Sequence, residues 1–157
     1  MDGKTPIKWG EINFTGSDVY DRILDAKRKV KAFKSELDYD YVVLEAAVMV
    51  RSAQTGLKMA YVFGAILGEL IEDGVDVKEV HPITWQSYIG NKNFTTAEKK
   101  KLRVDFPDKS DNWYKNKTRE IRKQRTISFV ESIGVKTTND NVADATGIAW
   151  YAVNELL

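Results

Sequence analysis

The chain has 157 residues, of which 43% are hydrophobic and 30% charged, and its formal net charge is +1. These values are typical of one globular domain, and no apolar run is long enough to cross a bilayer. The absence of cysteine excludes disulfides and thiolate metal sites, and a single histidine, His81, excludes a multi-histidine zinc site. We expect His81 to be structural, and any bound metal to be a hard cation, Mg²⁺ or Mn²⁺, on carboxylate oxygens.

The small net charge hides a strongly basic segment between Lys99 and Arg125. It contains eleven Lys and Arg residues against four acids, a net charge of +7, whereas the rest of the chain carries −6. Such a division indicates either a polyanionic partner on one face or a solvated helix surface. The charge pattern alone leaves both interpretations open.

The order of predicted elements indicates an α/β layer fold in a single domain over residues 1–157. Alternation and short apolar runs predict strands at 7–14, 41–44 and 75–84. Helical spacing predicts helices at 18–35, 53–72, 114–132 and 140–156, with a short helix from Trp85. Ser17 is the expected N-cap of the first helix, and the polar stretch 90–113 is expected to form loops and helix fragments.

Glu45 ends the apolar run of the second predicted strand. A strand of this kind is expected to be buried on both faces, so a carboxylate at its end needs a partner. Strand ends are also where α/β proteins place their sites. The alternative to a functional role is an ordinary ion pair with Arg51 or a neighbouring lysine.

Asp140, Asn141 and Asp144 are spaced to share one face at the start of the last predicted helix. The helix dipole favours acids there, so a cap at Asp140 and a first-turn acid at Asp144 form a complete structural explanation. That explanation does not account for Ala143 and Ala145 on either side of Asp144. Small neighbours would let this face lie close to the sheet, where Glu45 could meet it.

Four segments together resemble a known family. They are VVLEAAVMVRSAQTGLKMAYVFGAI (42–66), ITWQSYIG (83–90), KTREIRK (117–123) and NDNVADATGIA (139–149). In this order and spacing the chain resembles the RuvC-type crossover junction endodeoxyribonucleases, the Holliday junction resolvases, over about residues 9–157. The resemblance implies a ribonuclease H-like mixed sheet flanked by helices, and a cytoplasmic homodimer of bacterial or phage type that cuts four-way DNA junctions with Mg²⁺.

The resemblance also assigns the acids. Glu45 matches the second metal-ligating carboxylate and Asp144 the last. The family's remaining acid falls on Asn141, so Asp140 and Asn141 are expected to share that role. The family's opening strand, with its own catalytic Asp, has no counterpart here, because WGEINF resembles the third strand and Asp2 precedes a turn. We therefore expect either a truncated start or a defective form, which leaves a non-catalytic branched-DNA-binding protein or an unrelated regulator of the same fold as alternatives.

Basic residues complete the expected DNA contacts. Lys123 matches a family lysine that contacts the backbone near the cut, and it is supported by Lys117, Arg119 and Arg122. Trp85 takes the place of another family lysine, so it is expected either to stack on DNA or to anchor the core. Arg51, with Met49 and Val50, lies near the expected junction centre, in a stretch (46–66) that leads into a subunit-pairing helix; simple packing is the alternative.

Overall fold

The computed structural model describes residues 1–46, 52–71 and 74–157. The described chain divides into two compact units. The first unit joins Met1–Gly10 to His81–Leu157, and the second unit is Glu11–Val80. A single domain over residues 1–157 stays a prediction. In the described part of the chain, no helix combines the length and the apolar character that crossing a bilayer requires.

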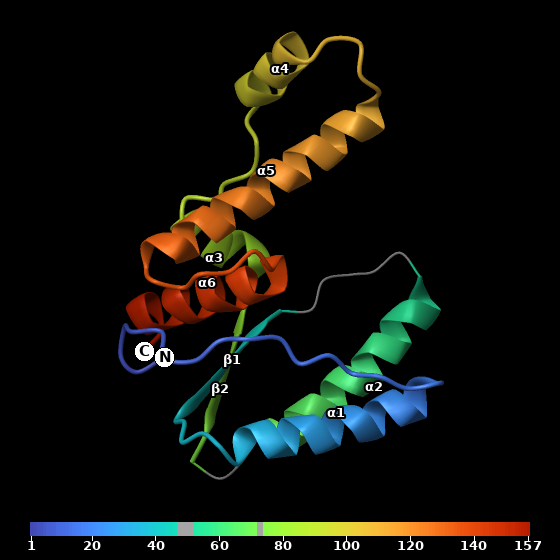
Figure 1. The fold of residues 1–157 in the computed structure, drawn as a ribbon, viewed down its shortest axis with the longest axis vertical. Coiled ribbons are helices and arrows are strands. Elements are labelled where there is room, and N and C mark those ends of the chain that lie inside the picture. The colour runs from blue at the N-terminus through green and yellow to red at the C-terminus, as the bar shows by residue number, and fades with distance from the viewer. Residues whose placement is uncertain (47–51, 72–73) are drawn as a thin grey trace. The chain divides into compact units, whose positions relative to one another are not determined.

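The second unit contains two helices and a small parallel sheet (Figure 1). Its elements are α1 (Val19–Lys34), β1 (Tyr41–Glu45), α2 (Ala53–Leu70) and β2 (Asp76–Val80). The strands run parallel in a register that places Tyr41 opposite Asp76 and Glu45 opposite Val80. Helix α2 makes the connection between them, as parallel strands require, and α1 packs against α2. The predicted helices and the strand at 41–44 are therefore confirmed.

The start of α1 differs from the prediction. Its N-cap is Asp18, whose carboxylate accepts from the backbone N–H groups of Tyr20 and Asp21. Ser17 instead donates its hydroxyl to the Asp21 carboxylate at 2.5 Å. The predicted strand at 7–14 is wrong, because residues 6–16 have no regular structure. Alternation alone does not make a strand, since a strand also needs a hydrogen-bonded neighbour.

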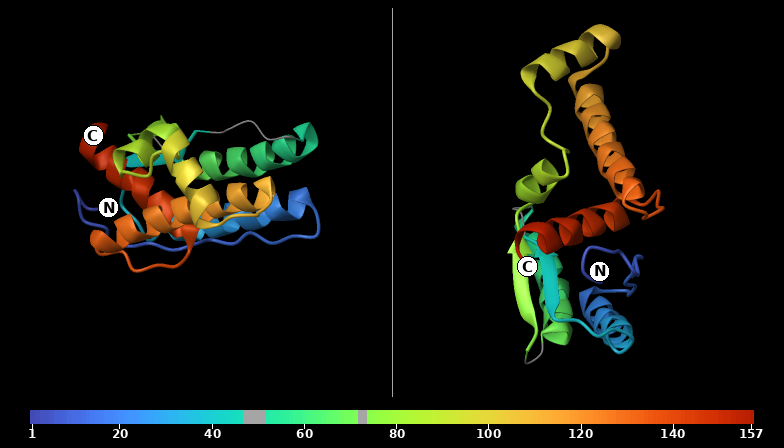
Figure 2. Two further views of the ribbon diagram at one scale, coloured as in Figure 1. Left: turned by 90° about the horizontal axis from the view of Figure 1, so that it is seen from above. Right: turned by 90° about the vertical axis from the view of Figure 1, so that its left-hand side faces the viewer.

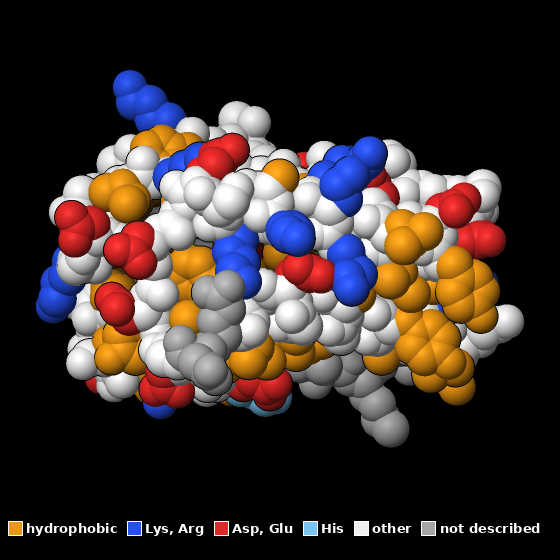
Figure 3. Space-filling view, turned by 90° about the horizontal axis from the view of Figure 1, so that it is seen from below, with side chains coloured by type: hydrophobic (Ala, Val, Ile, Leu, Met, Phe, Trp, Pro, Cys, Tyr) orange, Lys and Arg blue, Asp and Glu red, His pale blue; other side chains and the backbone are white. Residues whose placement is uncertain are grey.

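Burial in the second unit is lower than the sequence predicts. Within β1 only Val42 is buried, and among the described residues β1 pairs with β2 alone. The strand is therefore an edge strand, not one covered on both faces. Helix α2 has no buried residue. Leu57, in its first turns, and Ile71, its C-cap, are each 53% exposed. Figure 3, which views the molecule from the side of α1, shows apolar side chains at the surface among the charged ones.

The first unit is helical. Its elements are α3 (Pro82–Tyr88), α4 (Thr96–Asp105), α5 (Asp111–Ser132) and α6 (Asp140–Glu155). Helix α6 packs against α5 and α3. The core between α5 and α6 contains Ile127, Val130, Val135 and Ala143. The predicted helices at 114–132 and 140–156 are confirmed, and Gly134, with a φ of 95°, follows the end of α5 in the conformation that favours glycine.

The starts of α3 and α4 are set by caps. Helix α3 begins at Pro82, not at Trp85, because the His81 ring nitrogen accepts from the backbone N–H of Ile83 at 3.4 Å and the proline fixes the first turn. This cap also ends the predicted strand 75–84 at Val80. Helix α4 begins with a complete capping box between Thr95 and Glu98.

Helix α4 lies across the N-terminal end of α5 (Figure 2). We call α4, the turn 106–110 and the N-terminal end of α5 the α4–α5 corner. Leu102 of α4 and Tyr114 of α5 are buried there. The Tyr114 hydroxyl donates to the Phe106 carbonyl at 2.5 Å, and the Arg103 guanidinium lies 4.4 Å from the Tyr114 ring centre. The corner is thus fixed by side-chain contacts from both helices.

Candidate functional site

The start of α6 carries the acids that the sequence singles out. Its N-cap is Asn139, whose side-chain oxygen accepts from the backbone N–H groups of Asn141 at 2.9 Å and Val142 at 3.2 Å. The structural explanation that made Asp140 the cap is therefore wrong by one residue. Asp140 and Asp144 are half-buried and Asn141 is exposed. All three lie in the first two turns of α6, where unpaired backbone N–H groups favour negative charge.

Asp140 is paired with Lys123 across the α5–α6 contact. The hydrogen bond from the Lys123 ammonium is the main reason that the pKa of Asp140 lies below its usual range, and a backbone hydrogen bond at the start of α6 acts in the same direction. The expected phosphate-binding lysine and one of the expected acids are therefore direct neighbours.

The packing of α6 fixes the direction in which these acids point. Ala143 is fully buried in the core between α5 and α6, so a larger side chain would push the helix start away from α5. Ala145, on the other side of Asp144, is exposed. Ala143 therefore packs toward α5, whereas the close approach of this helix face to the sheet stays a prediction.

Glu45 ends β1, opposite Val80 in the parallel pair. Its side chain is exposed, so the argument from a buried strand end is wrong. Glu45 lies in the second unit, whereas the acids of α6 lie in the first. Their convergence stays a prediction. Arg51, the expected partner or DNA contact, lies outside the described residues, as do Met49 and Val50.

The donors on α6 are of the type that a hard cation prefers, but few of them lie together. Asp140, Asn141 and Asp144 offer two carboxylates and one amide oxygen. Within each unit, the described His, Asp and Glu side chains form no group of three or more that could hold a metal ion. A metal at the start of α6 would therefore need a further carboxylate, and Glu45 is the one that the sequence proposes.

The predicted DNA-binding residues have different surroundings. Lys117 pairs with Glu120 at 2.8 Å on the same helix. The Arg122 guanidinium donates to the side-chain oxygen of Gln86, and the Arg122 carbonyl accepts from Asn91 at 3.0 Å, so Arg122 ties α5 to the end of α3. Arg119 and Lys123 are exposed.

Trp85 is fully buried. A β-carbon placed on Gly147 of α6 would lie 2.8 Å from its ring, which shows how closely the two helices meet. A ring in this position has no exposed face on which a base could stack. Of the two roles left open for Trp85, the structure shows the core anchor.

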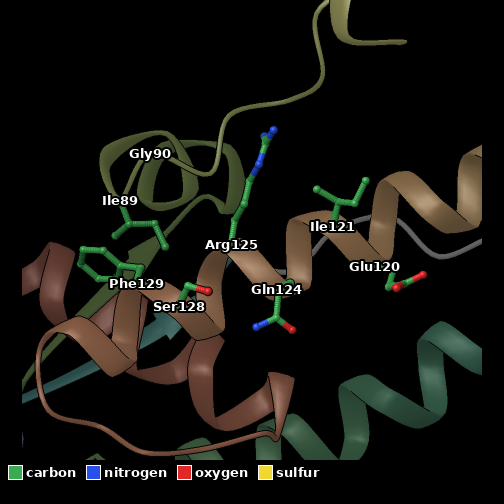
Figure 4. A pocket seen from close by; sticks show the side chains of 8 residues that line it. All are labelled: Ile89, Gly90, Glu120, Ile121, Gln124, Arg125, Ser128 and Phe129. Carbon is green, nitrogen blue, oxygen red and sulfur yellow. The ribbon is translucent and has the colours of Figure 1, made fainter. Parts of the chain in front are cut away.

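The first unit also has two surface pockets that the sequence did not predict. One, of about 670 Å³, lies between the end of α3 and α5, and the acids of α6 do not line it (Figure 4). There Ile89 and Phe129 lie side by side while Gln124 and Glu120 point away from them. The other, of about 480 Å³, lies in the α4–α5 corner. We call it the corner groove, and its charged lining is Lys99, Arg103, Asp111, Lys115 and Arg119.

The spacing of the groove cations in the sequence indicates which of them share a helix face. Lys99 and Arg103 are four apart on α4, and Lys115 and Arg119 are four apart on α5, so each pair shares one helix face. What the sequence did not provide was the turn that brings these two faces together. That arrangement depends on the contacts of Leu102, Phe106 and Tyr114.

Comparison with known proteins supports the fold. No family model matches the chain, and no curated protein does. The solved structures that it resembles include "T. thermophilus RuvC in complex with Holliday junction substrate", with a TM-score of 0.61 and 15% identity over 92% of this chain and 76% of that one. A second is "Thermus thermophilus RuvC structure", with a TM-score of 0.59 and 17% identity over 91% of this chain and 76% of that one. The chain therefore has a RuvC-like, ribonuclease H-like α/β fold, as the sequence predicts.

Proposed function

We propose that this chain is a metal-dependent endonuclease domain that cuts four-way DNA junctions as a homodimer. The observation that carries the proposal is the start of α6. Two carboxylates and an amide lie there in two turns, beside the ammonium group of Lys123, in a fold similar to that of a protein solved with a Holliday junction substrate. Acids next to a basic group suit a site that holds a cation and an anionic phosphodiester together.

The proposed metal is Mg²⁺, with Mn²⁺ as a substitute, held by Glu45, Asp144 and either Asp140 or Asn141. When bound, such a metal lowers the pKa of an attacking water and stabilises the leaving oxygen. The chain's own contribution is positioning. The Asn139 cap and the buried Ala143 fix the first turns of α6 and hence its acids.

Lys123 has a second role in this proposal. Its ammonium group neutralises Asp140, and it is 60% exposed, so it can also face an incoming phosphate. Arg119 lies one turn earlier on the same side of α5 and is exposed. These two cations are better candidates for backbone contacts than Lys117 and Arg122, which are less exposed and are held by Glu120 and Gln86.

The homodimer is proposed through α2. Helix α2 contains no buried residue although it is rich in apolar side chains, and Met59 and Tyr61 are 58% and 46% exposed. A large exposed apolar face on one helix suits a partner, and the commonest symmetric partner is a second copy of the same chain. The stretch preceding α2 belongs to the region that the sequence places near the junction centre.

The second candidate is a junction-binding protein without cleavage activity. The observation that favours it is Asn141, which stands where the resembled family has an acid and brings no negative charge. Two carboxylates on α6 provide less negative charge for holding a divalent cation than three would. This alternative keeps the basic residues and the dimer but not the chemistry.

The test is cleavage of a synthetic four-way junction, with Mg²⁺ or with a chelator. We expect Mg²⁺-dependent cutting, and a loss of more than about 100-fold in Glu45→Gln and in Asp144→Asn, since ligand loss should exceed the effect of losing an outer-shell partner. Glu131→Gln, at an exposed acid on the last turn of α5, is the matched control. Binding without cutting by the unaltered chain would favour the second candidate. Equal affinity for the junction and a linear duplex would remove both.

A further inference from the structure

The corner groove is more basic than the pocket between α3 and α5, whose charged lining is Glu120 and Arg125. Four cations line it, Lys99 and Arg103 from α4 and Lys115 and Arg119 from α5, against the single acid Asp111. The acid is already engaged, because Arg103 pairs with it at 2.6 Å. This hydrogen bond lowers the pKa of Asp111, so the carboxylate stays charged and remains the partner of Arg103.

Two further acids near the groove are paired with cations that do not line it, so among the described ion pairs Arg103 is the only groove cation with an acidic partner. Asp105 pairs with Lys101 at 2.9 Å, and Glu98 pairs with Arg125 at 3.0 Å. Among the described ion pairs, none uses Lys99 or Arg119. Like charges gathered in this way repel one another, so an anion in the groove would relieve the repulsion.

The walls of the groove are held in place by contacts that do not involve Lys99, Lys115 or Arg119. Leu102 and Tyr114 are buried at its base, the Tyr114 hydroxyl is bound to the Phe106 carbonyl, and Thr118 donates to the Tyr114 carbonyl at 2.8 Å. Arg103 is held over the Tyr114 ring. Because the backbone positions are fixed in this way, an anion would meet cations already gathered, with little ordering cost.

The groove is continuous with the candidate site. Lys115, Arg119 and Lys123 follow one another at four-residue steps, so they form a ridge along one side of α5 with a rise of roughly 6 Å per step. The ridge begins in the groove and ends at Lys123, beside Asp140. Its length, roughly 12 Å, exceeds what one free phosphate ion could span. A phosphodiester backbone matches a line of cations of this length.

We infer that the corner groove binds the phosphate backbone of a duplex arm of the DNA substrate and guides it along α5 to the start of α6. The inference rests on the proposed function and adds a contact, on Lys99 and Lys115, that lies away from the acids. Such a contact positions DNA without reading its sequence. It should therefore strengthen binding to a four-way junction and to a linear duplex alike.

The test compares two double variants of the full chain. Lys99→Gln/Lys115→Gln removes two groove cations, and Lys100→Gln/Lys101→Gln removes the same charge from the same region of the chain, at positions that do not line the groove. The dissociation constant for junction and duplex is measured from low to moderate salt. Each lost phosphate contact lowers the slope of log affinity against log salt by about 0.9, so we expect the groove variant to lose about 2 and the control less than about half of that. At 0.1 M salt the groove variant should bind at least about tenfold more weakly.

The outcomes separate the groove from the proposed function. The preference of the unaltered chain for a junction over a duplex tests the function, whereas the difference between the two double variants tests the groove. Equal slopes in the two variants would overturn the inference and leave the function intact. Weaker binding of inorganic phosphate with unchanged DNA affinity would also overturn it, since the groove would then hold a small free anion.

A direct measurement guards against indirect effects of the charge changes. Because the chain has no cysteine, Lys99→Cys and Lys100→Cys each introduce a single thiol, which can carry a photoreactive group. We expect irradiation to crosslink junction DNA from position 99 and not from position 100. Equal capture from the two positions would contradict a backbone path through the groove.

Discussion

Gly147→Ala should destabilise the contact that holds α6 in place. Gly147 lies in the interior of α6, where glycine normally costs stability and alanine would be preferred. A β-carbon at this position would lie 2.8 Å and 3.1 Å from two ring carbons of Trp85 and 3.5 Å from the Ile89 side chain. The Trp85 ring is fully buried, so it cannot move aside freely.

Two opposing effects set the magnitude. Overpacking a dense core costs about 1–3 kcal/mol, whereas replacing a helical glycine by alanine gains about 0.5–1 kcal/mol. Two sub-contact distances to a rigid ring place Gly147 in the upper half of the first range. The expected net loss is about 1–2 kcal/mol of unfolding free energy, which for a chain of this length corresponds to a fall in Tm of roughly 2–8 °C.

The assay is urea unfolding of Gly147→Ala alone and in a Trp85→Leu background. Leucine lacks the two ring carbons, so the alanine should cost less there, and the double-mutant cycle should give a coupling of at least about 1 kcal/mol. Ala145→Gly, at an exposed position of α6, reports helix propensity alone. A neutral or stabilising Gly147→Ala, or a coupling of zero, would refute the reasoning.

Three further predictions concern substitutions of single residues. Lys123→Gln should raise the pKa of Asp140 toward its ordinary value, as followed by NMR. Because the pair is partly exposed, the unfolding free energy should fall by less than about 1 kcal/mol. This difference between the variant and the unaltered chain should vanish as the pH drops below about 4 toward the lowered pKa. The hydrogen bond from Lys29 holds the pKa of Asp25 well below its usual range. Asp25→Asn should therefore remove the part of the loss in unfolding free energy that begins below about pH 4, as measured by denaturant unfolding at a series of pH values. Gly64→Ala should stabilise the monomer by about 0.5–1 kcal/mol, because a β-carbon at this position would meet nothing within 4 Å. The same substitution should weaken any dimer formed through α2, as measured by sedimentation.

The elements that sequence analysis predicted correctly are those with local signals. The helix at Val19–Lys34 has regular apolar spacing, and the helix at Asp140–Glu155 follows a cap residue. The helix at Thr96–Asp105 lies in the stretch 90–113, for which the sequence predicts only loops and helix fragments because few of its residues are apolar. Its capping box, Thr95 and Glu98, is nevertheless present in the sequence. The stretch at 7–14 alternates like a strand, but strand formation depends on a neighbour that the pattern cannot specify.

The candidate site divides in the same way. The shared face of Asp140 and Asp144 follows from helical spacing, which is local. The ion pair between Lys123 and Asp140 and the contact between Trp85 and Gly147 join distant parts of the sequence and depend on how α3, α5 and α6 pack. The exposure of Glu45 could likewise not be predicted from the sequence, because an apolar run indicates a buried strand whether or not other strands cover it.

The pairing of Lys123 with Asp140 constrains how the proposed site can work. A carboxylate that accepts from an ammonium group gives up part of its charge to that bond, so Asp140 is a weaker metal donor while the pair is intact. If Asp140 instead binds a metal ion, the Lys123 ammonium loses its partner at the end of the α5 ridge. A phosphate group could then replace Asp140 as its anionic partner. If Asp140 stays paired, the metal depends on Asp144 and Asn141 with Glu45. In both cases Lys123 links the acids of α6 to the basic side of α5, so its substitution should affect DNA binding and cleavage together, whereas substitution of Lys99 should affect binding alone.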